Sequence, residues 1–237
     1  MSKSTRNHIS SADVPPIVQS LTRAFGELPQ VVAVVLAGSR GAATSDLESD
    51  FDLYVYTLRD VPPEFRRGLM GERAEIDNRF WESSDEWTEP STGTQIDIMY
   101  RTPEWIEGQL ERVLVRQEAA LGYTTCFWYN TNHSEVLFDP RGWYRQLQTR
   151  ACVPYPEGLR RAVVMKNWPL LRRNYSSYRR QIELALNRGD AVSVQHRVTA
   201  LLASFFDVWF AVERQPHPGE KRLLSHLPEP WASRVRL

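Results

Sequence analysis

The sequence of 237 residues carries 29 Lys and Arg against 29 Asp and Glu, so its net charge is zero and we do not expect it to bind extended nucleic acid. The length suits one large or two small domains that each bury a core. No run approaches the length of about eighteen apolar residues needed to span a membrane, and the first ten residues show no apolar signal segment. The two cysteines have no metal-ligand spacing. We therefore expect a cytoplasmic protein with no membrane partner.

The N-terminal part of the sequence is predicted to alternate helices and strands. Apolar residues recur at helical spacing before an unbroken apolar run of buried-strand length, and later runs combine apolar and β-branched residues in the manner of strands. Thr102 followed by proline is a suitable helix start. The expected helices cover residues 15–28, 62–70 and 103–114, and the expected strands cover residues 31–36, 51–56 and 94–100.

Two further segments of this part have weaker patterns. Residues 79–87 are acidic and aromatic without a clear period, so we expect a loop in which Trp81 and Trp87 pack in the core or a lid rather than stack on a ligand ring. Residues 127–139 contain short apolar runs around a polar stretch at Asn130, which predicts a hairpin.

From residue 156 onward the apolar spacing is helical, so the second domain is predicted to be all α. Its central helix is expected to keep Asp207 off the apolar face, and the five histidines are expected to be surface or capping residues. Residues 215–219 break that helix, and a further helix is expected from Glu220. Lys221 then lies near a helix N-terminus, where a cation is unfavourable unless an anion is nearby.

The sequence around Gly38-Ser39 and Asp50-Phe51-Asp52 carries most of the functional signal. The apolar strand ends at a glycine that lets backbone N–H groups approach an anion closely. Asp50 and Asp52 are two residues apart in the next strand, so both carboxylates are expected on one face while Phe51 points to the core. Paired carboxylates repel each other unless a cation lies between them, and hard oxygen ligands suit Mg²⁺.

A third carboxylate is available at Asp97, between Ile96 and Ile98. An aspartate inside a β-branched run is disfavoured by strand propensity and needs a reason. On its own, Asp97 would be interpreted as a solvated residue of an edge strand. Together with Asp50 and Asp52 it is better interpreted as a third member of the same site.

This pattern resembles the DNA polymerase β-type nucleotidyltransferase superfamily: Gly-Ser, a gap, Asp-x-Asp and a following acidic strand, with Gly41 in the place of the family's second glycine. Within that superfamily the sequence is most similar to bacterial enzymes that adenylylate aminoglycosides and lincosamides. The motifs cover roughly residues 30–100. The resemblance implies an α+β fold with a nucleotidyltransferase domain, a small mixed sheet flanked by helices, at residues 1–150. An all-α domain at residues 151–237 would complete the nucleotide and acceptor cleft.

The resemblance also implies an activity: Mg²⁺-dependent transfer of an NMP, AMP from ATP in the first instance, to a hydroxyl of a small-molecule acceptor such as an antibiotic, with release of pyrophosphate. Three carboxylates would hold the metal, as two ions with bound NTP, and take part in catalysis: Asp50, Asp52 and Asp97. The motif does not distinguish a general base from a metal ligand at the third position. The residues expected to bind the nucleotide phosphates are Gly38, Ser39, Arg40 and, from the helical domain, Lys221.

The charge is divided unevenly along the chain. Residues 151–237 hold fourteen Lys and Arg against seven Asp and Glu, a net charge of +7, which leaves −7 for residues 1–150. An acidic half that collects Mg²⁺ and a basic half that meets a triphosphate would suit nucleotidyl transfer. Most of the arginines are nevertheless expected on solvated helix faces. The candidates for an acceptor pocket in the helical half are Tyr175, Tyr178, Glu183 and Asp190, and the sequence does not separate them.

Two alternatives stay open at the level of sequence. In one, the same chemistry modifies a protein or a tRNA, and the basic helical half is the docking surface. In the other, the chain is a non-catalytic nucleotide-binding module. The presence of all three carboxylates, Asp50, Asp52 and Asp97, argues against the second alternative.

Overall fold

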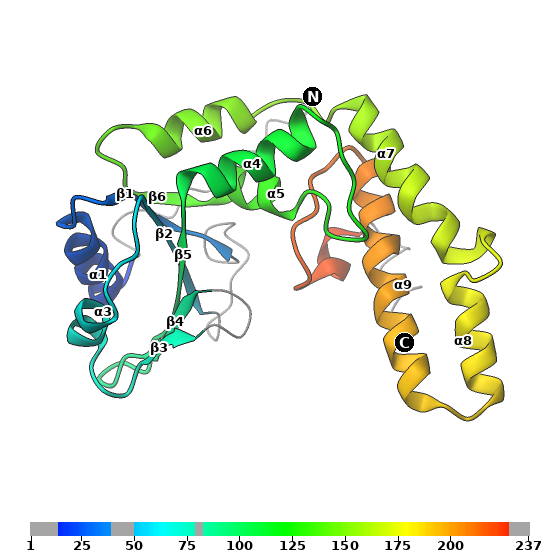
Figure 1. The fold of residues 1–237 in the computed structure, drawn as a ribbon, viewed down its shortest axis with the longest axis horizontal. Coiled ribbons are helices and arrows are strands. Elements are labelled where there is room, and N and C mark those ends of the chain that lie inside the picture. Colours follow the sequence, from blue (N-terminus) through cyan, green and yellow to red (C-terminus); the bar gives the residue numbers. More distant parts are fainter. Residues whose placement is uncertain (1–13, 39–49, 79–82, 228–237) are drawn as a thin grey trace. The chain divides into compact units, whose positions relative to one another are not determined.

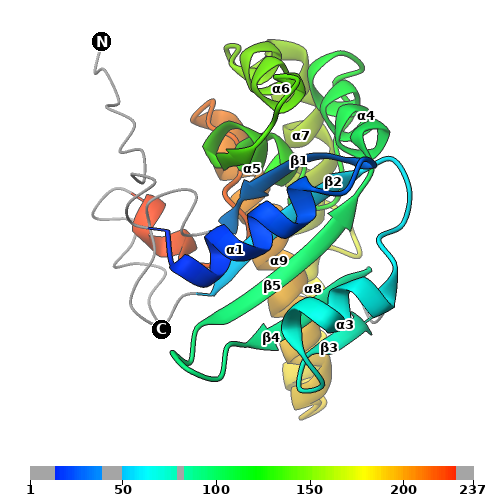
Figure 2. The same cartoon turned by 90° about the vertical axis from the view of Figure 1, so that its left-hand side faces the viewer.

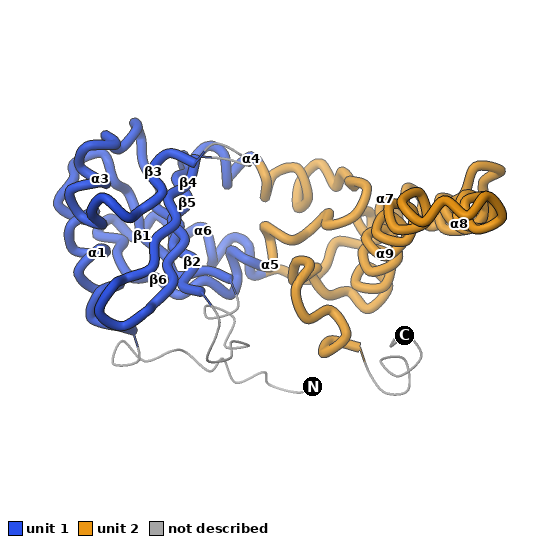
Figure 3. The backbone as a smooth tube through the Cα atoms, turned by 90° about the horizontal axis from the view of Figure 1, so that it is seen from below, with its two compact units in different colours: residues 1–108, 130–152 blue, residues 109–129, 153–237 orange. Residues whose placement is uncertain are grey.

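The structure is a computed structural model that describes residues 14–38, 50–78 and 83–227. The chain forms two compact units, one of residues 1–108 and 130–152 and the other of residues 109–129 and 153–237 (Figure 3). The last crossing between the units lies two residues from the boundary expected at residue 150. The units are not two continuous halves of the chain, because residues 109–129 belong to the helical unit. The chain therefore passes between the units three times.

Unit 1 is built on a six-stranded mixed sheet with the order β3-β4-β5-β2-β1-β6 (Figure 1). Strands β2 and β5 are parallel, and every other neighbouring pair is antiparallel. The strands are β1 (Val31–Leu36), β2 (Phe51–Thr57), β3 (Glu75–Asn78), β4 (Ser84–Thr88), β5 (Gln95–Arg101) and β6 (Glu135–Phe138). The strands expected over residues 31–36, 51–56 and 94–100 are β1, β2 and β5.

Helices α1 (Pro16–Gly26) and α3 (Pro63–Met70) lie on the same face of this sheet, as Figure 2 shows. Leu21 and Phe25 of α1 belong to the same buried cluster as Leu53 and Ile98 of the sheet. Burial of this apolar surface fixes which side of β2 and β5 faces the core. Residues of odd number in β2 and of even number in β5 therefore point toward α1 and α3, and the intervening residues point to the opposite face.

Part of the opposite face is covered by α6 (Trp143–Ala151). Tyr56 of β2 is buried there, with its ring centroid 5.2 Å from that of Trp143 and 5.3 Å from that of Tyr144. These aromatic contacts close the end of the face nearest the C-terminus of β2. Asp52 lies four residues earlier on the same face of the strand and is only partly buried.

The predicted start of α4 (Pro103–Leu114) is confirmed in its atomic detail. The Oγ1 atom of Thr102 accepts a hydrogen bond from the backbone N–H of Trp105 at 3.2 Å, and Pro103 occupies the first helical position. The helix passes from unit 1 into unit 2, since the division between the units falls after residue 108.

Two predictions in unit 1 and its borders are wrong. The loop expected over residues 79–87 contains strand β4, in which Trp87 is buried in the core as expected of that side chain. Trp81 lies outside the described residues. The hairpin expected over residues 127–139 is instead helix α5 (Cys126–His133) followed by β6. The helix forms because packing buries the ring of Trp128, a tertiary contact that overrides the local pattern.

The described residues of unit 2 form helices and loops without a strand, in agreement with the predicted α+β fold class. Its elements after the crossing are α7 (Glu157–Trp168), the π-helical turn η2 (Pro169–Arg173), α8 (Tyr178–Asn187), α9 (Ala191–Val212) and the 3₁₀ turn η3 (Leu223–His226). Helix α9 packs along both α7 and α8 (Figure 1). None of the helices in the described ranges combines the length and apolar character required to cross a membrane.

Two side chains of unit 2 expected at the surface are buried. Asp207 accepts hydrogen bonds at 2.9 Å from the backbone N–H and at 2.6 Å from the hydroxyl of Thr124, and Asn167 donates a third at 3.2 Å. His217 is fully buried between Phe210 and Tyr123. Both side chains depend on contacts with residues distant in sequence, Thr124 for Asp207 and Tyr123 for His217, which helix periodicity does not show.

Candidate functional site

The predicted carboxylates Asp52 and Asp97 are brought together by the central strands of unit 1. In the parallel pair of β2 and β5 they occupy the same register position. Register partners on adjacent strands lie on the same face of a sheet about 5 Å apart. Both residues are partly buried, while Leu53 and Ile98 beside them are fully buried on the other face. The sheet therefore places these two carboxylates side by side and away from the core.

Asp50 lies one residue before β2 and joins Asp97 in lining a cavity of about 550 Å³. The remaining wall of the cavity comes from the strands and turns at this end of the sheet: Arg73, Glu75, Glu86, Trp87, Thr88, Pro90 and Gln95. All of these residues belong to unit 1. The sequence-predicted pair Asp50 and Asp97 thus faces a space large enough for a small-molecule group.

Gly38 lies directly against Asp52. A Cβ atom added to this glycine would come 1.8 Å from Oδ2 of Asp52, and the glycine has a φ of +61°. The backbone N–H of Ala37 also donates a hydrogen bond at 2.8 Å to the carbonyl oxygen of Asp52. Glycine is therefore required here both for the left-handed backbone and for the approach of a carboxylate to the chain after β1. The expected proximity of the Gly38 turn and the acidic pair is present.

The acidic pair belongs to a longer row of carboxylates that crosses four strands. Glu75 of β3 pairs with Glu86 of β4, Glu86 pairs with Asp97 of β5, and Asp97 pairs with Asp52 of β2. Like charges that face one another across strands destabilise a sheet. A row of four such groups in register costs stability unless opposite charges lie close to it.

Glu75 and Glu86 were not predicted as site residues. Their place in the row depends on the register of β3 and β4, which local periodicity did not reveal. Asn78 donates a side-chain hydrogen bond at 3.3 Å to Oε1 of Glu86. The only local signal was the alternation of Asp85, Glu86 and Trp87, in which the acidic residue between two buried neighbours points outward.

A buried ion pair holds β4 in this register. Nη1 of Arg66, on α3, lies 2.6 Å from Oδ1 of Asp85, which also accepts the backbone N–H of Asp77 at 2.8 Å. The hydroxyl of Tyr100 donates to Oδ2 of Asp85 at 2.6 Å, and the Arg66 guanidinium lies 4.7 Å from the centroid of the Tyr100 ring. Burial beside the Asp85 carboxylate raises the pKa of Tyr100 well above its usual value. This network points Asp85 inward and so turns Glu86 toward the cavity.

The sequence predicts that these carboxylates hold Mg²⁺. Among residues 14–38, 50–78 and 83–227, no three His, Cys, Asp or Glu side chains are gathered in a group placed to hold a metal ion. Mg²⁺ does not require such a group, because it commonly binds one or two carboxylates and completes its octahedral shell with water and substrate phosphates. The oxygen donors of Asp50, Asp52 and Asp97 and the space kept open by Gly38 fit that mode of binding.

The other predicted site residues lie outside the described residues or in unit 2. Ser39 and Arg40 lie outside the described residues. Lys221 is exposed in a turn before the four-residue η3, and not at the start of an α-helix as predicted. The argument from the helix dipole therefore does not apply to Lys221. Asp190, a candidate for an acceptor pocket, is the N-cap of α9 and accepts the backbone N–H of Ser193 at 3.0 Å.

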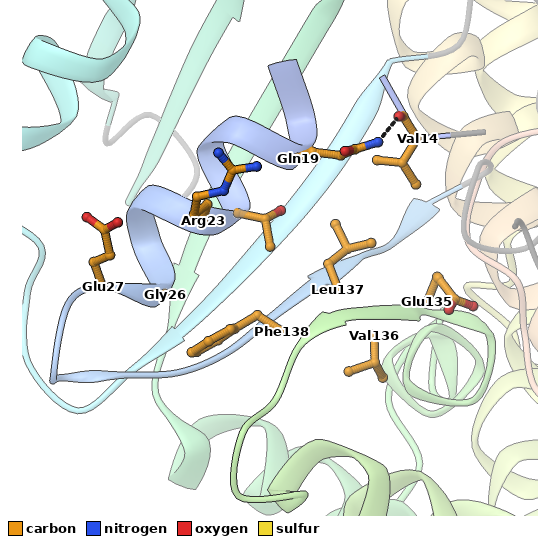
Figure 4. A pocket seen from close by; sticks show the side chains of 10 residues that line it. Val14, Gln19, Arg23, Gly26, Glu27, Glu135, Val136, Leu137 and Phe138 are labelled. Carbon is orange, nitrogen blue, oxygen red and sulfur yellow. Dashed lines mark hydrogen bonds between the residues drawn. The ribbon is translucent and has the colours of Figure 1, made fainter. Parts of the chain in front are cut away.

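A second cavity of unit 1, about 620 Å³, lies between α1 and the edge strand β6 (Figure 4). Arg23 and Glu27 of α1 and Glu135 of β6 contribute its charged groups, and Phe138 packs over Gly26. The cavity contains none of the predicted site residues. Its lining comes from the opposite end of the strand order to Glu75 and Glu86, so it is separate from the carboxylate row.

Comparisons with known proteins match this chain to a family model and to solved structures. Residues 127–223 match a family model described as a domain of unknown function (DUF4037). The crystal structure of a nucleotidyltransferase-like protein from Exiguobacterium sibiricum 255-15 is similar to this chain with a TM-score of 0.42 and 10% sequence identity. The alignment covers 88% of this chain, which spans 60% of the length of that one. No curated protein matches the sequence. Neither match assigns an activity to the chain.

Proposed function

We propose that this protein is a nucleotidyltransferase that moves an NMP from an NTP to a hydroxyl group of a small molecule and releases pyrophosphate. The observation that carries the proposal is the register pairing of Asp52 with Asp97, beside Asp50 and against Gly38. The sequence pattern that resembles polymerase β-type enzymes supplies these same residues. AMP from ATP is the first choice of donor, and an antibiotic is one candidate acceptor.

In the proposed reaction an acceptor oxygen attacks the α-phosphorus of the nucleotide, and the bond to the bridging oxygen of the β-phosphate breaks. Asp50 and Asp52 would hold Mg²⁺, which when bound neutralises charge on the phosphates. Asp97 would either accept the proton of the acceptor hydroxyl or add a further metal ligand. The backbone after Gly38, with Ser39 and Arg40, would orient the outer phosphates.

The carboxylates at the far end of the row favour an acceptor that carries positive charge. Glu75 and Glu86 line the same cavity as Asp97, with Arg73 as the only basic residue among the described lining residues. An acceptor with an amino group near its reactive hydroxyl would be attracted to these carboxylates, whereas an anionic acceptor would be repelled. We therefore include cationic amino alcohols among the first acceptors to be tested.

The proposal is tested by incubating the protein with Mg²⁺, an acceptor panel and ATP, CTP, GTP or UTP labelled at either the α- or the γ-phosphate. The expected product carries the α-label and is accompanied by labelled pyrophosphate from the γ-labelled donor. A product carrying the γ-label would instead identify a phosphotransferase and contradict the proposal. The variant Asp97→Asn separates the two possible roles of Asp97. Loss of a general base should lower kcat by about a hundredfold at unchanged NTP affinity, whereas loss of a metal ligand should lower the NTP affinity.

Lys221 remains part of the proposal as a contact to the triphosphate. Lys221→Ala is then expected to weaken NTP binding by about 1.5–3 kcal/mol, the scale of a charge-assisted hydrogen bond, and to leave NMP binding unchanged. Equal NTP affinities of wild type and variant would remove Lys221 from the site.

A further inference from the structure

A small cavity of about 310 Å³ lies in unit 2 at the turn between η2 and α8. Its lining is polar and basic and is drawn from a short stretch of sequence: Arg172, Asn174, Tyr175, Ser177, Arg179 and Arg180, with Glu183 at one side. Residues 172–176 are all exposed, so the cavity opens to solvent within unit 2 itself.

The positive charge of this cavity is only partly compensated. Arg179 forms a salt bridge with Glu183 at 2.9 Å, and Arg180 lies 3.8 Å from the same carboxylate. Arg172 makes no salt bridge or side-chain hydrogen bond with any described residue of the chain. The cavity lining therefore holds three guanidinium groups against one carboxylate, which leaves a net positive site for an anion. Guanidinium groups bind phosphate through paired hydrogen bonds.

An exposed aromatic ring lies among these arginines. Tyr175 is 92% exposed, in contrast to Tyr56 and Tyr144, which pack in the interior of unit 1. The stretch from Arg172 to Arg180 places two arginines on each side of Asn-Tyr-Ser-Ser-Tyr. Alternation of cations with an accessible aromatic ring is the combination with which proteins bind single-stranded nucleic acids, whose phosphates contact the cations and whose bases stack on the ring.

The first turn of α8 has a charge distribution that favours a bound anion. Ser177 caps the helix by accepting the backbone N–H of Arg180, and the first turn contains two arginines and no acidic residue. Cations in the first turn of a helix are unfavourable with respect to its dipole. A phosphate bound by Arg179 and Arg180 would relieve this repulsion.

We propose that the η2–α8 cavity binds a single-stranded segment of RNA, with phosphates on Arg172, Arg179 and Arg180 and one base stacked on Tyr175. The zero net charge of the whole chain does not oppose this, because the positive charge is concentrated in residues 151–237. An acidic or phosphorylated peptide would satisfy the arginines but would give no partner to the Tyr175 ring.

The test is fluorescence anisotropy of the full chain with a short, labelled single-stranded RNA, without NTP or Mg²⁺, over a series of salt concentrations. The variant Arg172→Ala/Arg179→Ala/Arg180→Ala is expected to lower affinity at least tenfold. It should also reduce the slope of log K against log salt by about 2, since each phosphate contact to a single strand contributes about 0.7.

A charge-matched control is available in Arg161→Ala/Arg188→Ala/Arg197→Ala, which removes three exposed arginines of the same unit outside the cavity. This control is expected to change affinity less than threefold. Tyr175→Ala should lower affinity about tenfold, and Tyr175→Phe should retain it because the ring still stacks. Circular dichroism and melting temperature verify folding of each variant.

Three results would overturn the proposal: no RNA binding by the wild type, equal losses in the two triple variants, or equal affinities of the Tyr175→Ala and Tyr175→Phe variants. Tighter binding of a phosphorylated peptide than of RNA would also contradict it, because the stacking partner would then be irrelevant. The proposal is independent of the proposed catalysis. Asp52→Asn should therefore bind RNA as the wild type does, and loss of binding in that variant would count against a separate site in unit 2.

Discussion

Asp52 and Asp97 face the same side of the sheet as register partners of two parallel strands that lie 45 residues apart in sequence. Glu86 extends this pairing to the next strand, and Glu75 extends it again. Each carboxylate in the row raises the electrostatic cost of its neighbours. In the proposed function, a bound divalent cation would offset this repulsion.

Neutralising one member of the row should relieve repulsion. Asp52→Asn is expected to keep or slightly raise the melting temperature without metal, and to lose the rise that Mg²⁺ with NTP gives the wild type. Differential scanning calorimetry with and without Mg²⁺·NTP measures both effects. Asp60→Asn, a change at an exposed carboxylate just after the same strand, is the matched control and should behave as the wild type. A full ligand-induced rise in Asp52→Asn would argue against a role for Asp52 in binding the metal.

Gly38 should tolerate no side chain. Gly38→Ala places a Cβ atom 1.8 Å from Asp52 Oδ2, so either the carboxylate or the backbone must move, and NTP binding should fall at least tenfold. Gly142→Ala is the control: its φ of +68° imposes a similar backbone strain of about 1 kcal/mol, but its nearest contact is an ordinary 3.8 Å. Titration calorimetry with NTP compares the two. Equal losses of affinity would show that strain, and not displacement of Asp52, is responsible.

The buried pair of Arg66 and Asp85 should be stabilising only as a pair. Arg66→Met leaves the Asp85 carboxylate buried without its cation and is expected to cost about 3–5 kcal/mol. Adding Asp85→Asn removes the uncompensated charge, so the double variant should be less destabilised than the sum of the two single changes. Urea unfolding of the four proteins gives the coupling energy. Strictly additive effects would mean that the pair does not hold β4 in place.

His217 should make stability depend on pH. Burial, with a smaller contribution from His226, lowers the pKa of His217 to about 4, and its Nδ1 accepts the backbone N–H of Gly219 at 3.1 Å. The unfolded chain binds the proton near the ordinary pKa of 6.5, so the contribution is fully present above pH 6.5 and is lost as pH falls toward 4. The shift corresponds to a loss on the order of 3 kcal/mol.

His217→Asn keeps an acceptor for Gly219 and does not titrate. Its free energy of unfolding should therefore fall less than that of the wild type between pH 7 and pH 4, as measured by chemical denaturation. Parallel pH profiles of the two proteins would contradict the buried neutral imidazole.

Asp207 should have the opposite effect in the same pH range. Burial raises its pKa to about 6, although hydrogen bonds from Thr124 act in the other direction. The folded state then binds the proton more tightly than the unfolded state, so this contribution is fully present below pH 4 and is lost as pH rises through 6. The stability advantage of the wild type over Asp207→Asn is thus expected to shrink as pH rises from 4 to 6. A constant difference would indicate that Asp207 does not titrate in this range.

The strands at the candidate site could be predicted because their signals are local. Val31 to Leu36 is uniformly apolar, and the alternation of Phe51, Asp52 and Leu53 assigns each side chain to a face. The order of strands could not be predicted. Nothing near Asp97 in the sequence shows that β5 runs parallel to β2 at a register that aligns Asp97 with Asp52.

The features that were not predicted from the sequence all depend on contacts between residues far apart in the chain. Asp85 is buried because Arg66, nineteen residues earlier, neutralises it, and only then does β4 have a regular inward and outward alternation. Asp207 is buried because Thr124, 83 residues earlier, supplies its hydrogen bonds. In both cases the sequence alone predicts a solvent-exposed acidic residue, and a tertiary contact keeps that residue buried. The same long-range pairing hid Glu86 as a member of the site.

The most direct measurement of the central claim is transfer of label from [α-³²P]ATP to an amino-alcohol acceptor in Mg²⁺, compared among wild type, Asp52→Asn and the control Asp60→Asn. Wild type and Asp60→Asn are expected to form the same labelled product at similar rates, and Asp52→Asn should be slower by several orders of magnitude while remaining folded. Transfer by Asp52→Asn at a rate near that of the wild type would contradict the account.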